Sequence, residues 1–124
     1  MIDIVPELES TAQKFQFEIK SIIESSVPPP NAPSTIAKKG HDHTLIDKGN
    51  YLKSIDYEVT EHGFVVAPND PKIAIIATYN EHGTAHIPPR PVWGPVADGV
   101  GERILDELEQ DILDKFVLVL KGGK

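Results

Sequence analysis

The sequence predicts an α+β fold in which a small antiparallel sheet packs against an N-terminal and a C-terminal helix. Apolar residues recur every three or four positions over residues 6–26 and again over residues 98–115, which is typical of amphipathic helices. Between them, residues 55–67 contain two short runs with the composition of strands. The length of 124 residues suits one domain, so we expect a single domain over residues 1–124.

The N-terminal helix begins near Pro6, because proline is well tolerated in a first turn. The positions that we expect it to bury are Leu8, Ala12, Phe15, Ile19 and Ile22 or Ile23. The run Val27-Pro28-Pro29-Pro30 ends it, since proline cannot continue a helix. Residues 28–43 show no periodicity and predict a long flexible loop of proline, lysine and histidine.

The middle of the chain predicts a short helical turn followed by a hairpin. Residues 44–54 form the turn, with Asp47 as its cap. The side chains expected to be buried here are Leu45, Leu52 and Ile55. Residues 55–60 alternate apolar and polar, residues 61–63 make a tight connection, and residues 64–67 form the second strand.

Two segments in the second half of the chain carry helix signals. Three isoleucines in residues 72–82 favour a strand, but Asp70-Pro71 before them and Gly83 after them favour a helix, which we predict. In the C-terminal helix the buried row is Ile104, Leu108 and Ile112, widened by Leu105, Leu113 and Phe116. Residues 117–120 either extend this helix or form a short strand.

Composition excludes several classes of function. The net charge is −7, and none of the stretches 1–34, 35–97 and 98–124 is net basic, which argues against direct DNA binding. The absence of cysteine excludes disulfides, thiolate metal sites and a cysteine nucleophile. The start of the chain lacks the pattern of a signal peptide, and no apolar run could span a bilayer. We therefore expect synthesis in a cytoplasm, no secretion by a cleavable signal and no membrane partner.

Residues 80–95 pair histidines with a proline run. His82 and His86, together with His41 and His43, are candidate ligands of a small metal-dependent enzyme. Against this, no HExxH motif is present, no acidic residue completes a set of ligands, and Gly83 interrupts the helix. No Gly-x-Ser-x-Gly elbow or phosphate-binding loop occurs either, so we expect no enzyme and no cofactor.

The run Pro88-Pro89-Arg90-Pro91 has two interpretations. As a polyproline II ligand it would make the protein a host-interaction module. As rigid architecture it would carry the chain between two helices, with Trp93 as a buried anchor. The guanidinium of Arg90 would then bind a carboxylate or backbone carbonyls, inside the subunit or between subunits.

Two motifs resemble one protein family. The segment Asn80-Glu81-His82-Gly83-Thr84, followed by Ile87-Pro88-Pro89-Arg90-Pro91-Val92-Trp93-Gly94-Pro95, is similar to the "E-F-G-T … P-A-R-P-F-L-x-P" signature of tail-completion and head–tail joining proteins of long-tailed phages. A related form occurs in Mu-like virion morphogenesis proteins and in lambdoid minor tail components. Residues 44–55 look like the "L-x-D-T-G-x-L-x-x-S-I" segment of the same family. The departures are His82 for an aromatic residue, Lys48 for threonine, Pro89 for alanine and Val92-Trp93 for Phe-Leu.

This resemblance implies a structural virion protein without cofactors or a metal. Copies would form a homo-oligomeric ring, often a hexamer, at the neck of the virion, in contact with neck, connector and tail-tube proteins. DNA would only pass through the channel, along an acidic helix face that contains Glu102, Asp106 and Glu109. The candidate interface residues are Gly83, Thr84, Arg90 and Trp93, with Lys38 and Lys39 in a loop that orders when it meets a neighbour.

Overall fold

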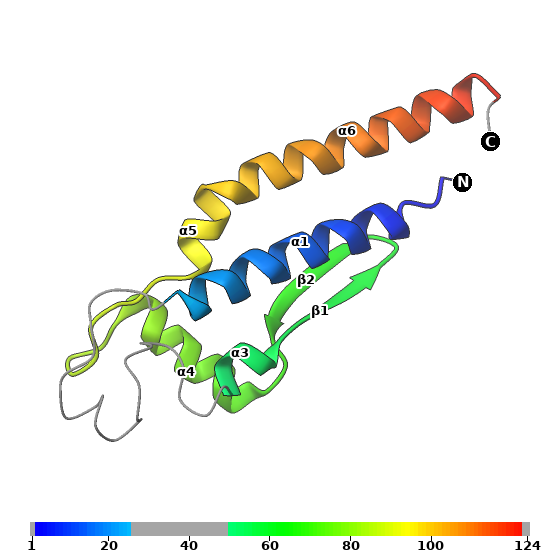
Figure 1. The fold of residues 1–124 in the computed structure, drawn as a ribbon. Coiled ribbons are helices and arrows are strands. Elements are labelled where there is room, and N and C mark those ends of the chain that lie inside the picture. The colour runs from blue at the N-terminus through cyan, green and yellow to red at the C-terminus, as the bar shows by residue number, and fades with distance from the viewer. Residues whose placement is uncertain (1, 26–49, 123–124) are drawn as a thin grey trace.

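The computed structural model describes residues 2–25 and 50–122, and its elements form an α+β fold (Figure 1). The elements in chain order are α1 (Val5–Glu24), α3 (Asn50–Ser54), β1 (Ile55–Thr60), β2 (Gly63–Pro68), α4 (Pro71–His82), α5 (Trp93–Asp98) and α6 (Val100–Leu120). The predicted loop 28–43, the cap Asp47 and the apolar Leu45 lie outside the described residues.

Helix α1 lies between the hairpin and α6 (Figure 1). It buries Leu8, Thr11, Ala12, Ile19 and Ile23. Four of these are predicted positions, and Thr11 is a polar addition to the same face. Phe15 is half-buried and stacks on Phe64 of β2, with ring centroids 5.7 Å apart. The periodicity of residues 6–26 is therefore confirmed as the pattern of a helix with one buried face.

Strands β1 and β2 form a two-stranded antiparallel sheet, as the alternation predicts. The pairing runs from Ile55 opposite Pro68 to Thr60 opposite Gly63. Ile55, at the start of β1, is 1% exposed and joins the main core with residues of α1 and α3. Since an isolated hairpin is marginally stable, the cover that α1 supplies is what holds this sheet.

Helix α6 runs antiparallel to α1 and is held to it by two ion pairs. Lys14 Nζ lies 3.1 Å from Glu107 Oε2, and Lys115 Nζ lies 2.8 Å from Glu7 Oε1. Residues 117–120 extend the helix, which settles the alternative left open by the sequence.

The predicted width of the buried row on α6 is wrong. Ile104 is buried and Leu108 and Ile112 are half-buried, whereas Leu105, Leu113 and Phe116 are exposed. The reason is that α6 packs on α1 along one side, so that only a narrow stripe is covered.

Candidate functional site

Helix α4 leads into the segment that carries the proline run. The carboxylate of Asp70 caps its start, with Oδ1 accepting a hydrogen bond of 2.9 Å from the N–H of Lys72. Gly83 ends it with φ +78°, and its N–H donates to the carbonyl of Tyr79 at 2.8 Å. The cap, the proline at the first position and the terminal glycine thus outweigh the strand propensity of the isoleucines.

A tight turn follows Gly83. The N–H of Thr84 donates to the carbonyl of Ile87 at 2.8 Å, and the hydroxyl of Thr84 accepts from the N–H groups of His86 and Ile87 at 3.2 and 3.1 Å. A Cβ atom on residue 83 would lie 2.9 Å from Cδ of Pro89, so glycine is required by space as well as by φ. The Gly-Thr pair of the motif therefore builds the turn itself.

After the turn the chain returns along the end of α4. The N–H of Arg90 donates to the carbonyl of Asn80 at 2.6 Å, and the Arg90 residue is only 8% exposed. Pro88, Pro89 and Pro91 are exposed around it. A buried charged residue inside one subunit favours the internal role of Arg90 over the intersubunit one.

Glu81 joins α4 to α5 through its carboxylate. Oε1 accepts from the N–H groups of Val92 and Trp93 at 2.7 and 3.0 Å, and Oε2 accepts from the N–H of Gly94 at 2.9 Å. These are the free backbone donors at the start of α5, and a negative charge there is favoured by the helix dipole. The glutamate of the motif thus acts as the N-terminal cap of the next helix.

Trp93 is half-buried, which corrects the prediction of a buried anchor; the fully buried neighbours are Val92 and Val96. The indole N–H donates to the hydroxyl of Tyr51 at 3.0 Å and so ties α5 to α3. Burial raises the pKa of Tyr51, the hydrogen bond from Trp93 lowers it, and the charge of Glu81 raises it, for a net rise. The indole is half-exposed because a hollow borders it.

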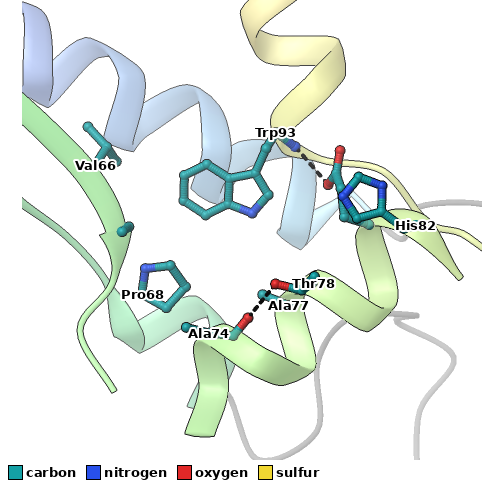
Figure 2. A pocket seen from close by; sticks show the side chains of 9 residues that line it. Val66, Pro68, Ala74, Ala77, Thr78, His82 and Trp93 are labelled. Carbon is teal, nitrogen blue, oxygen red and sulfur yellow. Dashed lines mark hydrogen bonds between the residues drawn. The ribbon is translucent and has the colours of Figure 1, made fainter. Parts of the chain in front are cut away.

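The hollow has a volume of about 300 Å³ and lies between β2 and α4 (Figure 2). Its lining is Val66, Ala67, Pro68, Ala74, Ala77, Thr78, Glu81, His82 and Trp93. The carboxylate of Glu81 is already occupied by three backbone donors, and the hydroxyl of Thr78 donates to the carbonyl of Ala74 at 3.0 Å. Two of the polar groups in the lining therefore already have hydrogen-bond partners within the fold.

The structure brings four of the six candidate interface residues into one connected segment. Gly83, Thr84, Arg90 and Trp93 all lie between the end of α4 and the start of α5, and each makes its described contacts within the chain. Their part in an interface stays a prediction. Lys38 and Lys39 lie outside the described residues.

Of the four histidines in the metal hypothesis, two lie within the described residues and two lie outside them. His82 ends α4, His86 lies in the turn, and both are exposed. His41 and His43 lie outside the described residues. Within residues 2–25 and 50–122, no group of three or more histidine, aspartate or glutamate side chains is placed to hold a metal ion.

Two important residues were missed by the sequence analysis, Glu81 and Tyr51. Glu81 was noted only as a letter of the motif, because its bonding partners lie 11 to 13 residues away and leave no local capping pattern. Tyr51 meets Trp93 across 42 residues. The one available signal was that a half-buried indole needs an acceptor, which a tyrosine hydroxyl can supply.

Comparison with protein-family models, with curated proteins and with solved structures finds no match to this chain. In the described part of the chain, no helix has the length and apolar content needed to cross a membrane.

Proposed function

We propose that this chain is a structural virion protein, a tail-completion or head–tail joining subunit at the neck of a long-tailed phage. Copies would form a ring, which neighbouring connector and tail-tube proteins contact. The subunit would act without a cofactor and without catalysis, and it would assemble in the host cytoplasm before it is built into the particle.

One observation carries the proposal, namely what the motif residues do. Glu81 caps α5, Gly83 allows the turn against Pro89, and Thr84 closes that turn. These contacts give a structural reason for the spacing E-x-G-T … P-x-R-P, and they need no ligand or substrate. A motif whose residues stabilise the fold suits a protein whose role is to present a surface of defined shape.

The α+β fold agrees with the architecture that the resemblance implies. The acidic residues Glu102, Asp106 and Glu109 are exposed along α6. In a ring, such a face would repel the phosphates of DNA that passes through the channel, and so would favour sliding over binding.

The test is mass spectrometry of particles purified from cells in which the gene is deleted or restored. We expect the protein in restored particles at a few copies per particle, and unjoined heads and tails when it is deleted. Normal infectious particles that lack the protein would contradict the proposal.

A further inference from the structure

Helix α4 carries apolar residues on both of its sides. Ala77 is buried against the core, whereas Ile75, Ile76 and Tyr79 on the opposite side are 54%, 54% and 49% exposed. A helix that is apolar all round is normally covered all round. We call these three residues the α4 face; Lys72, one turn earlier, lies on the same side of the helix.

Helix α6 exposes a second apolar stripe near its C-terminal end. The apolar residues from 116 to 120 are all exposed, and one row near them recurs at i, i+3, i+4 and i+7: Leu113, Phe116, Val117 and Leu120. Their exposed fractions run from 45% for Val117 to 70% for Leu120. We call these four residues the α6 face.

The two faces cannot cover each other within one molecule. Helix α4 lies at the end of the subunit where α3 lies, and the C-terminal end of α6 points to the opposite end (Figure 1). Contiguous exposed apolar patches mark interaction sites. Two different patches at opposite ends are what a head-to-tail contact between identical copies requires.

The charges around the two faces are complementary. Lys72 is exposed and is the charged side chain on the outward side of α4, since Glu81 faces inward to cap α5. Residues 100–120 contain six acidic and two basic side chains, and both basic ones pair with glutamates: Arg103 with Glu107 at 3.9 Å and Lys115 with Glu7 at 2.8 Å. Glu109 lies one turn before Leu113, as Lys72 lies one turn before Ile75 and Ile76.

We infer that the α4 face of one copy docks on the α6 face of the next, with the two helices roughly parallel and Lys72 near Glu109. Glu109 then lies at the edge of this contact, which leaves Glu102 and Asp106 to face the channel. The opposite orientation would place Lys72 near Lys121, so charge selects the parallel one. The inference rests on the proposed function, which requires copies to meet, and it names the surfaces that do so. In this inference the turn from Gly83 to Arg90 stabilises the subunit and takes no part in the contact.

The first experiment is sedimentation of the purified chain between about 1 and 100 μM, where modest interfaces dissociate. Wild type should associate as concentration rises. Ile75→Glu and Val117→Glu should each raise the dissociation constant at least about tenfold, since each puts an unpaired charge into an apolar contact. Val65→Glu is the matched control for both, because Val65 is 62% exposed on the hairpin, away from both faces.

A mixing experiment separates a head-to-tail contact from a two-fold one. The Ile75→Glu chain keeps an intact α6 face, and the Val117→Glu chain keeps an intact α4 face. The two altered faces carry like charges, so they do not dock on each other. Mixed together, they should form 1:1 dimers and nothing larger. A wild type that stays monomeric, a mixture that stays monomeric, or an Ile75→Glu chain that associates as well as wild type would each overturn the inference.

These results are distinguishable from failure of the proposed function. Head-to-tail dimers in the mixture, with the protein absent from particles, would support the inference and refute the virion role. If the protein is present in particles and neither substitution changes its dissociation constant, the virion role is supported and the two docking surfaces are refuted.

Discussion

Glu81 is the residue on which the join between α4 and α5 depends. Its two carboxylate oxygens satisfy three N–H groups that the helical hydrogen bonds of α5 leave free. It is half-buried, so water can replace these bonds only in part.

We expect Glu81→Ala to lower the free energy of unfolding by about 1–3 kcal/mol, because partly buried donors lose a charged acceptor. Glu81→Gln keeps one acceptor oxygen and should lose less. Urea denaturation with an unchanged m-value measures both losses. Asp106→Ala, on the exposed side of α6 and outside the proposed contact between copies, is the control and should stay within about 0.5 kcal/mol of wild type. An equal response of Glu81→Ala and Asp106→Ala would argue against the cap.

Tyr51 gives the fold a dependence on alkaline pH. Burial raises its pKa in the folded state, so the folded chain holds the phenolic proton more tightly than the unfolded chain. This contribution to stability is fully present below the unfolded pKa of about 10 and is lost as the pH rises through the folded pKa.

The measurement is the free energy of unfolding across alkaline pH for wild type and Tyr51→Phe. We expect wild type to lose more stability than the variant above about pH 10, where only wild type has this proton to release. At neutral pH the variant should be less stable, because the indole N–H of Trp93 loses its acceptor. Parallel pH curves for the two chains would mean that Tyr51 ionises equally easily in both states.

The end of α4 depends on the backbone of one glycine. Gly83→Ala adds a strained φ and a Cβ atom 2.9 Å from Pro89, so we expect a loss of about 2–4 kcal/mol. Gly122→Ala keeps the positive φ with no neighbour within 4 Å and should lose about 1 kcal/mol.

Gly63→Ala is the third member of this series, with neither strain nor crowding. It should be neutral or slightly stabilising, since alanine has less freedom to lose on folding. Thermal unfolding of the three variants gives the order. If the Gly83 variant loses no more stability than the Gly122 variant, Pro89 moves aside without cost.

Among the elements, those with local signals were predictable from the sequence. Residues 6–26 carry a clear period, and Asp70, Pro71 and Gly83 bracket α4. Helix α5 was missed, because Trp93-Gly94-Pro95 reads as a break. Its proline falls in the first turn, where a missing N–H is tolerated, and its cap comes from a distant glutamate.

For the molecule as a whole, the sequence predicted the fold class but not how much apolar helix surface stays exposed to solvent. Periodicity shows which residues share a side of a helix, but not whether a neighbour covers that side. Some large apolar residues of the kind found in protein cores are exposed, among them Leu113 and Phe116 on α6 and Ile75 on α4. Their exposure depends on the path of the chain, which spacing alone does not determine.

The attachment of Lys115 has a mechanical consequence. Its ammonium group holds the carboxylate of Glu7 at 2.8 Å and also donates to the carbonyl of Asp3, so α6 is tied to the start of α1 at this point. The side chains of residues 116–120, which follow directly, are all exposed. The last turn of the helix thus extends past this attachment point, where few contacts oppose a small change in its angle.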